Sequence, residues 1–480
     1  MRVVLVKPPW YCLQGSGLNE IPIGLSSLAS FLNSNGHTAA VLNADTSGRS
    51  GVEYRQLYGN YEKYLAVLRD LTHPLWAGVL ADIAGFSPDV VGITLTTGAY
   101  RSACNIAALV KEKLPGVVVV AGGPHATILP EETAREGCFD YVARGEAEIT
   151  VAELLSRIEA GRSPSDVAGL TYLNGSTVVH TPDRPFIDDL DRLPFLERDA
   201  HLSREHYSPD AYGLLMTGRG CPFACTFCAS ERIWKRKVRF RSPGNVLDEI
   251  SLVREKYRTT HIKFRDDTFT LKKDRAMEIC EGIIRKGLAI TWQCDTRADC
   301  LDDELVRAMK RSGCIGVSIG VESGSPRILA DIRKGETREQ MECGVSLLHR
   351  HGINVTVFAM VGFPGESPEE IAQTFAFARG LNPDHIVASI LTPYPGTRIY
   401  DQFLDLGLIH RAPSWESWFH QSPETGLLGM RGDIRPLVER FLANVERYNT
   451  SPVRKARRIA VRLFRNPRGF ARRAVGRMKR

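Results

Sequence analysis

The sequence predicts an α/β protein in which two α/β units follow one another along the chain. Short apolar runs alternate with helical patterns through most of residues 1–400, and the spacing of this alternation changes near residue 210. Pro, Asp and Arg are enriched in residues 161–210, which separate the two patterns. Continuous apolar strands that alternate with helices are typical of parallel sheets with both faces covered. We therefore expect a doubly wound sheet in the first unit and a second parallel βα arrangement after it.

The first unit, residues 1–160, has apolar runs that predict strands, with helical patterns between them. The predicted strands are 3–6, 39–42, 90–95, 117–121 and 141–142, and the predicted helices are 23–35, 99–113, 130–136 and 149–159. Ligands of doubly wound sheets bind beyond the carboxyl ends of the strands. Small and turn residues are concentrated at those ends here, and glycine lets a ligand approach the backbone closely. The first unit is therefore expected to be a binding domain.

The second unit is predicted over residues 211–400, after a short hairpin and linker in residues 161–210. Its predicted strands are 214–217, 261–264, 289–293, 315–320, 354–359 and 385–391. Helical segments follow the first five strands, and residues 401–450 are predicted to form a helical C-terminal region. Polar, Gly or Pro residues follow every strand, and βα barrels gather their chemistry at that rim. We expect the residues after the six strands to share one site.

Three cysteines follow the first strand of the second unit in the spacing C-x3-C-x2-C. They are Cys221, Cys225 and Cys228, behind the loop 217–220. Three thiolates this close together can bind three corners of a cubic four-iron cluster, which leaves the fourth iron open to a substrate-like molecule. The alternatives are a zinc site or three unrelated packed cysteines. Zinc sites favour C-x2-C pairs with a second pair or histidines at matching spacing, and the sequence has none nearby, so the cluster is favoured.

The other eight cysteines are scattered along the chain with no framework spacing, which favours packed thiols in a reducing compartment. They are Cys12, Cys104, Cys138, Cys280, Cys294, Cys300, Cys314 and Cys343.

The cysteine run resembles the signature of the radical S-adenosylmethionine (SAM) superfamily, and Phe227 matches the aromatic position of that signature. The resemblance implies that the three cysteines ligate a [4Fe-4S] cluster whose open iron binds the amino and carboxylate groups of SAM. One electron, from an external reductant of the flavodoxin or ferredoxin type, would cleave SAM into methionine and a 5′-deoxyadenosyl radical. It also implies that the six βα units form a partial (βα)6, TIM-like barrel.

The strand-end acids and the arginine of the second unit match the SAM motifs of the family in order. Asp266 or Asp267 is expected to accept from the SAM amino group, and Arg297 to pair with the SAM carboxylate. Glu322 is expected to accept hydrogen bonds from the ribose hydroxyls or the methionine end. The alternative for each acid is a surface or capping role.

The turn between Gly362 and Gly365 follows the fifth strand and is expected to let backbone groups approach the adenine edge. Tyr394 follows the sixth strand and either faces the substrate cavity or packs as an ordinary core tyrosine.

The strand ends of the first unit, ahead of a radical SAM signature, resemble the cobalamin-binding domain of the B12-dependent radical SAM class. The residues that carry this expectation are Asn43, Asp45, Thr96, Gly122, Gly123, His125, Gly145 and Glu146. The resemblance implies a flavodoxin-like or Rossmann-like fold and bound cobalamin. The Asp-x-His-x-x-Gly motif, which supplies a histidine to cobalt in cobalamin-dependent mutases, is absent. His125 either approaches the corrin or makes ordinary hydrogen bonds.

The pairing of the two domains implies a cobalamin-dependent methyltransferase that acts on an unactivated centre of a small-molecule or lipid-like substrate. The same architecture resembles the anaerobic Mg-protoporphyrin monomethyl ester cyclases and ring-rearranging enzymes, which do not methylate, and the motifs do not separate these activities. A cluster-binding or cobalamin-binding sensor with a nucleic-acid-binding tail is the alternative from another class. The ordered SAM motifs disfavour it. A tRNA-modifying enzyme is disfavoured because no second cluster motif or RNA-binding end domain is present.

Residues 451–480 form a basic tail with twelve Lys or Arg and no Asp or Glu, whereas the rest of the chain has a net charge of −5. Its apolar residues recur at helical spacing, and Pro467 divides the pattern. Basic amphipathic helices bind anionic membrane surfaces. A disordered tail and a nucleic-acid arm are the alternatives, the last disfavoured because no base-stacking module accompanies it.

We expect the protein in the cytoplasm, with peripheral contact at the inner face of the membrane. The sequence has no apolar run long enough to span a bilayer, and the apolar part of its N-terminus is too short for a secretory signal.

Overall fold

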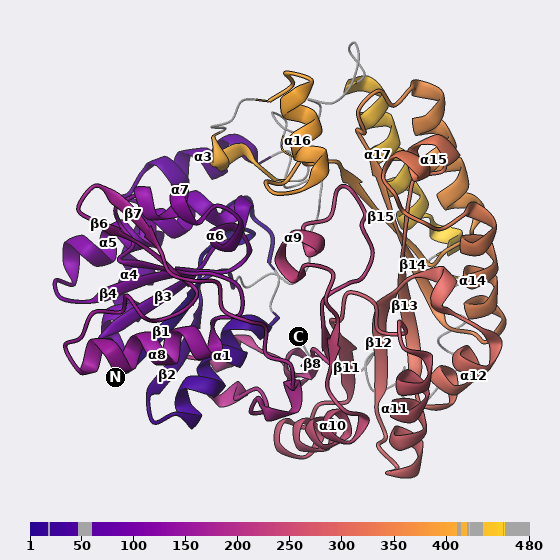
Figure 1. Ribbon diagram of the computed structural model, residues 1–480. Coiled ribbons are helices and arrows are strands. Elements are labelled where there is room, and N and C mark those ends of the chain that lie inside the picture. Colours follow the sequence, from indigo (N-terminus) through magenta and orange to yellow (C-terminus); the bar gives the residue numbers. More distant parts are fainter. Residues whose placement is uncertain are drawn as a thin grey trace.

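The computed structural model describes residues 1–17, 20–46, 60–409, 414–419, 422, 435–454 and 456. Two units built on parallel sheets lie side by side, the N-terminal unit in indigo and magenta and the second unit in rose and orange (Figure 1). Within the described residues no helix is both long and apolar enough to cross a membrane. Almost all of the basic tail, residue 455 and residues 457–480, lies outside the described residues.

The first unit is a seven-stranded sheet in the order β2-β1-β3-β4-β5-β6-β7. The strands are β1 (Arg2–Lys7), β2 (Thr38–Asn43), β3 (Val90–Thr94), β4 (Val118–Gly122), β5 (Tyr141–Ala143), β6 (Leu170–Asn174) and β7 (Thr177–His180). The first five pair in parallel, and the β6–β7 hairpin adds two antiparallel strands at the edge. The hairpin predicted within residues 161–210 thus extends the first sheet, while the exact domain boundaries stay a prediction.

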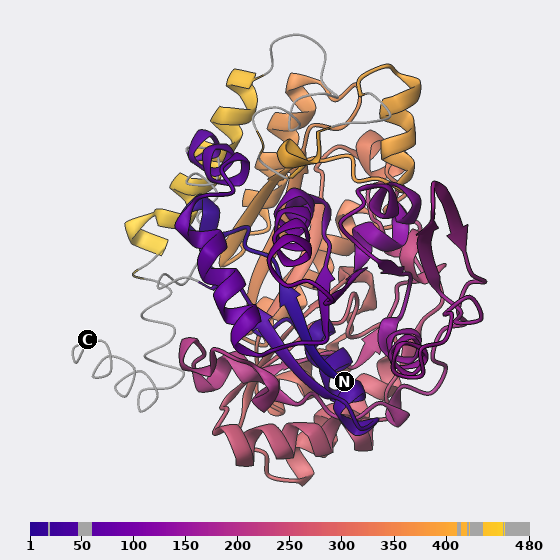
Figure 2. The same cartoon turned by 90° about the vertical axis from the view of Figure 1, so that its left-hand side faces the viewer.

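Helices cover both faces of this sheet, which confirms the doubly wound prediction. On one face, α1 (Ile23–Ser34) and α8 (Ala147–Glu159) pack on β1, β3 and β4. On the other face lie α3 (Tyr61–Arg69), α4 (Pro74–Gly85) and α5 (Tyr100–Lys113). The short helices α6 (Pro124–Ile128) and α7 (Pro130–Arg135) follow β4. Figure 2 views this unit with the barrel strands behind it.

The second unit is a six-stranded, all-parallel sheet in the order β15-β14-β13-β12-β11-β8. Its strands are β8 (Leu214–Leu215), β11 (His261–Phe264), β12 (Thr291–Thr296), β13 (Cys314–Glu322), β14 (Asn354–Val361) and β15 (His385–Ile390). Neighbours in sequence are neighbours in the sheet, and β8 and β15 are its edges. This is the predicted partial barrel, and the fold class is confirmed.

Helices follow the strands of the barrel, and residues of the sequence form capping boxes at the starts of two of these helices. They are α10 (Pro243–Tyr257), α11 (Lys273–Arg285), α12 (Asp303–Arg311), α13 (Pro326–Asp331), α14 (Arg338–Arg350), α15 (Pro368–Gly380), α16 (Arg398–Asp405) and α17 (Arg435–Thr450). Thr337 with Gln340, and Ser367 with Glu370, make reciprocal capping boxes that satisfy free amides at the starts of α14 and α15. A short antiparallel ribbon, β9 (Gly218–Arg219) with β10 (Arg239–Phe240), flanks the cysteine loop and the small helix α9 (Ser230–Trp234).

A fully buried arginine ties the linker to the barrel. Arg198 is 0% exposed and donates to the carbonyls of Tyr212 and Leu214, and it pairs with Glu249 of α10 at 2.9 Å. Because a buried charge is stable only when it is paired and hydrogen-bonded, these contacts fix the position of the first barrel strand relative to the linker.

Candidate functional site

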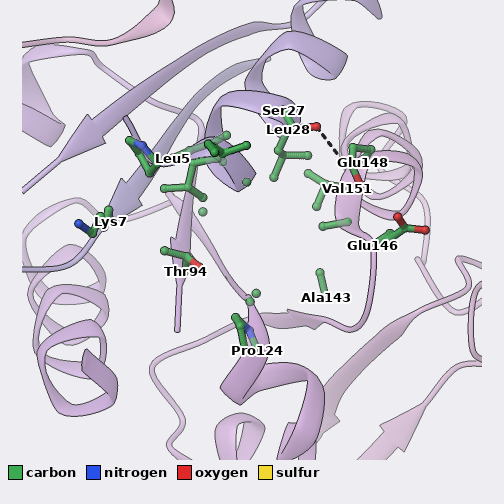
Figure 3. Close-up of a pocket in the computed structure, with 18 of the residues that line it drawn as sticks. Leu5, Lys7, Ser27, Leu28, Thr94, Pro124, Ala143, Glu146, Glu148 and Val151 are labelled. Carbon is green, nitrogen blue, oxygen red and sulfur yellow. Dashed lines mark hydrogen bonds between the residues drawn. The ribbon is translucent and has the colours of Figure 1, made fainter. Parts of the chain in front are cut away.

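A cavity of about 660 Å³ opens at the carboxyl ends of the first sheet. Its inner part is apolar and lies between the sheet and helices α1 and α8, where Leu5, Leu28, Ala143 and Val151 face one another (Figure 3). Its outer part is polar and includes Lys7. Residues of the linker and of the barrel complete the wall, so the cavity lies between the two units. A volume of this size suits a large cofactor with an apolar portion.

Two glycines keep this cavity open. A Cβ atom on Gly92 would lie 2.7 Å from Leu5 Cδ2. Gly123 has a φ of +93°, and a Cβ atom there would lie 2.6 Å from Thr94 Oγ1. At Gly123 the positive φ and the nearby Leu95 backbone require glycine, whereas a side chain at Gly92 would force the end of the Leu5 side chain to move.

Six of the eight residues predicted to bind cobalamin line this cavity, and two do not. The lining residues are Asp45, Thr96, Gly122, Gly123, Gly145 and Glu146. Asn43 is buried elsewhere and donates to Tyr207 Oη at 3.0 Å, so it ties β2 to the linker. The contacts of the six lining residues with cobalamin stay predictions.

His125 lines a separate, smaller pocket and lies outside the lining of the large cavity. Its Nδ1 is 3.1 Å from Thr97 Oγ1, and its ring packs against Tyr100 and Trp415 at centroid distances of 4.4 and 5.1 Å. Burial lowers the pKa of His125 to about 3, so the ring is neutral at physiological pH. Of the two sequence alternatives, the described contacts are those of an ordinary packed histidine.

A buried ion-pair network joins the cavity to the loop that carries the cysteines. Arg219 lies two residues before Cys221 and pairs with Glu146 at 2.5 Å and with Glu148 at 2.6 Å. Arg239 of β10 pairs with the second oxygen of Glu146 at 2.6 Å. Although burial opposes ionisation, Arg219 holds the pKa of Glu148 below its usual range. The N-terminal unit and the cysteine loop are therefore held together by charge at the edge of the cavity.

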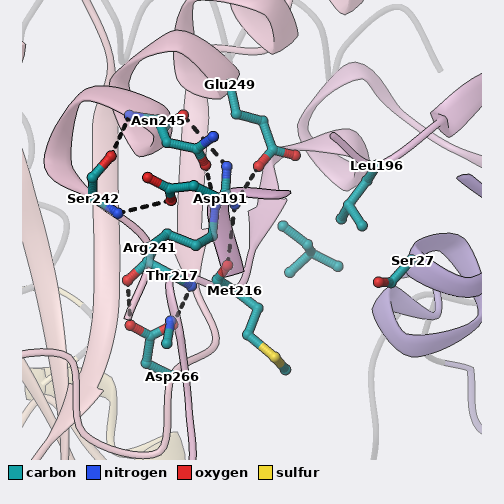
Figure 4. Close-up of polar contacts among 12 residues, drawn as sticks. Ser27, Asp191, Leu196, Met216, Thr217, Arg241, Ser242, Asn245, Glu249 and Asp266 are labelled. Carbon is teal, nitrogen blue, oxygen red and sulfur yellow. Dashed lines mark hydrogen bonds and ion pairs between the residues drawn. The ribbon is translucent and has the colours of Figure 1, made fainter. Parts of the chain in front are cut away.

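On the barrel side, hydrogen bonds fix the strand ends next to the cavity (Figure 4). Arg241 pairs with Glu249 at 2.5 Å and donates to Asn245 Oδ1 at 2.6 Å. Asp266 is buried and accepts from the backbone amides of Thr217 at 2.5 Å and Gly218 at 3.1 Å. The carboxylate of Asp266 is thus bound to the loop ahead of the cysteines, whereas Asp267 is exposed and its carboxylate accepts from Ser230 Oγ at 2.9 Å. Of the two predicted acids, Asp267 is the one free to meet a ligand amine.

The three cysteines of the motif lie on one loop at the barrel mouth, and their charges act on one another. The pKa of each thiol is raised, chiefly by burial, and Cys221 and Cys225 add to the effect at Cys228, whose pKa rises to about 12. Gly220 has a φ of +97°, and a Cβ atom there would lie 2.1 Å from the Lys237 carbonyl oxygen, so the loop requires glycine. Phe227 is partly buried and packs against the core, one residue before Cys228.

A cluster of charges lies beside these thiols, and most of its members were missed from the sequence. Arg297 is buried, its guanidinium lies 3.7 Å from the centre of the Phe223 ring, and it pairs with Asp299 at 2.7 Å. Lys334 pairs with Glu322 at 3.4 Å and with Glu336 at 3.3 Å. The stacked Phe223 belongs to the cysteine loop, so Arg297 also positions the loop that carries the three motif cysteines. Its predicted pairing with the SAM carboxylate stays a prediction.

Glu322 has a backbone conformation that the sequence did not indicate. Its φ is +57°, and the pairing of β13 with β14 shifts register between Gly320 and Glu322. A positive φ at a non-glycine residue is uncommon and gathers at functional sites. The bulge turns the buried Glu322 carboxylate toward Lys334 at the rim, beside the thiols.

The donors fit an anionic iron–sulfur cluster. Lys334 and Arg297 oppose the effect of burial at Cys225 and favour its thiolate, the form that binds iron. In the described part of the chain no three His, Cys, Asp or Glu side chains converge as ligands of one metal ion. Cys221, Cys225 and Cys228 are therefore a donor set that could hold such a cluster, and their assignment as its ligands stays a prediction.

Comparison with known proteins agrees with both units. Residues 215–378 match the radical SAM superfamily, and residues 14–155 match the B12 binding domain. An uncharacterized methyltransferase of Pyrococcus horikoshii (PH0819) is 36% identical over 406 residues, which cover 84% of this chain and 83% of that protein. The chain belongs to the cobalamin-dependent radical SAM family.

Other members of this family are named for methylation and for cyclisation. Bacteriochlorophyllide d C-12(1)-methyltransferase of Chlorobaculum tepidum is 31% identical over 68% of this chain and 67% of its own length. Anaerobic magnesium-protoporphyrin IX monomethyl ester cyclase of Rubrivivax gelatinosus is 29% identical over 93% of this chain and 77% of its own length. The solved structure of the methyltransferase TsrM from Kitasatospora setae, with cobalamin and a [4Fe-4S] cluster bound, shares the fold at a TM-score of 0.65 and 20% identity, over 86% of this chain and 79% of that one.

These findings confirm the predicted family and its cofactors, the [4Fe-4S] cluster, SAM and cobalamin. Methylation is better supported than the cyclase-like reaction, and the protein is an enzyme of the methyltransferase type. An enzyme of this kind acts on a small-molecule substrate and takes an electron from a reductant.

Arg219→Gln should destabilise the protein because it leaves the Glu146 and Glu148 carboxylates buried with one guanidinium fewer. Breaking a buried ion pair typically costs about 3–5 kcal/mol. Urea unfolding followed by circular dichroism should show that loss, and the additional change Glu148→Gln should recover part of it because it removes the uncompensated charge. Arg135→Gln, which breaks an exposed pair with Glu131, is the matched control and should cost under about 1 kcal/mol. Equal effects of Arg219→Gln and Arg135→Gln would contradict a clamping role.

Glu366→Gln should change how stability depends on pH. Burial raises the pKa of Glu366 to about 7, although the amides of Gly362 and Phe363 donate to its carboxylate at 2.6 and 3.1 Å. A carboxyl whose pKa is higher in the folded state stabilises the fold at low pH and loses that stabilisation as the pH rises through the folded pKa. Between pH 4.5 and 7.5 the free energy of unfolding of the wild type should fall by about 3 kcal/mol relative to the variant.

Glutamine keeps an oxygen that accepts from both amides of this turn, so the backbone next to the predicted adenine site should be preserved. Urea unfolding across this pH range measures the difference, and Glu342→Gln, on the exposed side of α14, controls for loss of a carboxylate. Parallel pH profiles for the wild type and Glu366→Gln would show that Glu366 is not the titrating group.

Proposed function

We propose that this protein transfers a methyl group from SAM to an unactivated carbon or phosphorus centre of a small-molecule or lipid-like substrate. The main support for this proposal is that the ion pairs of Arg219 hold the loop with the three cysteines at the edge of the large cavity of the B12-binding unit. When bound, the iron–sulfur cluster with SAM would supply radical formation, and cobalamin would supply methyl-group transfer.

The chain's own residues then have binding and positioning roles. Cys221, Cys225 and Cys228 hold the iron–sulfur cluster, and Arg297 supports their loop through Phe223. Asp267 accepts from the amine of SAM, and Glu322 accepts from its hydroxyls or its methionine end. The wall around Asp45, Thr96, Gly122 and Gly145 would hold cobalamin, and Leu5 and Val151 supply the apolar part of that wall.

The test of this function uses Cys225→Ala and a matched change at Cys280, a fully buried thiol of α11. The wild type, reconstituted without oxygen and supplied with SAM and a reductant, should form 5′-deoxyadenosine. Cys225→Ala should lose the cluster's electron paramagnetic resonance signal and reduce 5′-deoxyadenosine at least a hundredfold, since three thiolates are needed to hold the open iron. Cys280→Ala should keep both. A Cys225→Ala protein that forms 5′-deoxyadenosine at the wild-type rate would refute the ligand assignment.

The same assay separates methylation from the cyclase-like alternative. A SAM molecule that donates its methyl group becomes S-adenosylhomocysteine, whereas radical cleavage gives 5′-deoxyadenosine and methionine. Formation of both adenosyl products with a substrate extract supports methylation. Formation of 5′-deoxyadenosine alone with turnover of substrate supports cyclisation or rearrangement.

We further propose that the basic tail, residues 451–480, holds the protein at the inner face of an anionic membrane, and that the reductant is a flavodoxin or ferredoxin. Each Lys or Arg near an anionic surface contributes about 1 kcal/mol. The full chain should therefore sediment with phosphatidylserine vesicles at low salt, and a chain truncated after residue 450 should stay in the supernatant. Equal sedimentation of the two chains would exclude the tail as the contact.

A further inference from the structure

A second pocket, of about 210 Å³, lies between the large cavity and the cysteine loop. Trp10, Thr96 and Pro124 line both the pocket and the large cavity, so the two spaces adjoin. On the opposite side the pocket is lined by Ala229, which follows the cluster ligand Cys228, and by Tyr394 after β15. A molecule in this pocket would therefore meet both the cobalamin side and the cluster side of the enzyme.

The walls of this pocket carry no charge. Apart from Thr96, Thr97 and the packed His125, they are built from aromatic and aliphatic residues and backbone, including Trp10, Ile128 and Phe419. The pKa of His125, lowered by burial to about 3, keeps that ring neutral. The large cavity differs, because Lys7, Asp45, Glu146, Glu148 and Arg219 line it. An ionic group placed in the small pocket would lose its hydration and find no counter-charge, which is strongly unfavourable.

A segment from far along the chain closes this pocket. We call residues 414–419 the aromatic strap. Phe419 is fully buried, and its ring lies 5.6 Å from that of Trp10 and 5.7 Å from that of Tyr64. Trp418 donates to the carbonyl of Pro393 at 2.7 Å, and Trp415 donates to Glu132. The strap thus contacts the first unit and the barrel and holds the apolar wall in place.

The barrel and the first unit are in close contact at the rim of this pocket. Gly396 has a φ of +75°, and a Cβ atom there would lie 2.6 Å from Ile128 Cγ2 of α6. The loop after β15 and helix α6 are therefore in close contact beside Tyr394. This contact closes the pocket on the side of Gly396 and Ile128, and the small volume of the pocket limits what it can hold.

We propose that this pocket binds an uncharged, apolar portion of the substrate, such as one ring or a short branched hydrocarbon, and presents it between the two cofactors. This inference rests on the proposed function, whose methyl acceptor it defines. The volume is below the range of about 300–1,000 Å³ that encloses a drug-sized ligand. Only the reacting portion of a larger substrate fits, and an anionic group next to the acceptor atom is excluded.

The experiment compares two probes of nearly equal size, fluorobenzene and 4-fluorobenzoate, with the full chain loaded with cobalamin and cluster. Binding is measured by fluorine-19 NMR line broadening of the probe, which requires no turnover. Fluorobenzene should bind, and 4-fluorobenzoate should bind at least tenfold more weakly. Equal or tighter binding of the anion, or no binding of either probe, would overturn the proposal.

Substitutions at Ile128 locate the binding. Ile128→Trp should fill the pocket and weaken fluorobenzene binding at least fivefold, whereas Ile284→Trp, at an exposed position on α11, should leave it unchanged. Ile128→Lys places a cation in the wall and should reverse the preference toward 4-fluorobenzoate, with Ile284→Lys as its control. Circular dichroism verifies folding. Wild-type binding in both Ile128 variants would place the probe elsewhere.

The proposed function and this inference can fail separately. If the folded protein, loaded with both cofactors, forms neither 5′-deoxyadenosine nor S-adenosylhomocysteine, the proposed function is wrong. Loss of the preference for the neutral probe in a protein that still forms both products counts against the substrate class alone.

Discussion

The structure depends on the charge pairing of Arg219 at the junction of its two units. This guanidinium lies between two buried glutamates of the first unit, and it comes from the loop that leads into Cys221. None of the three charges can be left without its partners, because burial makes an uncompensated charge costly. The position of the loop that carries the three motif cysteines is therefore set by the first unit as well as by the barrel.

The same principle operates at the barrel rim. Arg297, Lys334, Glu322 and Glu336 form a second buried group of charges, and the stacking of Arg297 on Phe223 connects that group to the cysteine loop. The loop is thus restrained from two sides by arginines. One restraint faces the cavity of the first unit and the other faces the predicted SAM site, so the thiols keep a fixed place between them.

Much of the fold could be predicted because local patterns of apolar residues along the chain mark its strands and helices. The apolar runs at β1 and β2 are continuous, β14 alternates between buried and less buried residues, and the six barrel strands appear in sheet order. Helices α3 and α4 were missed, the latter because two glycines and a run of apolar residues hide any amphipathic period. Strand β12 runs from Thr291 to Thr296, so it begins and ends later than the predicted strand 289–293. Its end was missed because the polar residues Gln293 and Asp295 alternate with buried residues there.

The site could be predicted only where a motif is compact. The cysteine spacing was sufficient to propose Cys221, Cys225 and Cys228 as cluster ligands, and that assignment stays a prediction. Asp299, Lys334 and Glu336 could not be proposed, because they come close to these cysteines only through contacts between distant segments. Asn43 and Asp266 looked like ligand-binding residues because they follow strands, yet both are satisfied by protein partners, Tyr207 and the Thr217 loop. The position of a polar residue at a strand end does not reveal whether its side chain binds a ligand or a protein partner.

The aromatic strap has a consequence for how the enzyme is assembled. Chains fold from the N-terminus as they are synthesised, so the cobalamin-binding unit and then the cysteine loop can form before the strap is made. Phe419 is the last residue of the small pocket to be made, since it lies about 190 residues beyond Cys228 in the chain. The small pocket therefore lacks this part of its wall until residues 414–419 have been synthesised. Loading of both cofactors can precede the step that closes the substrate compartment.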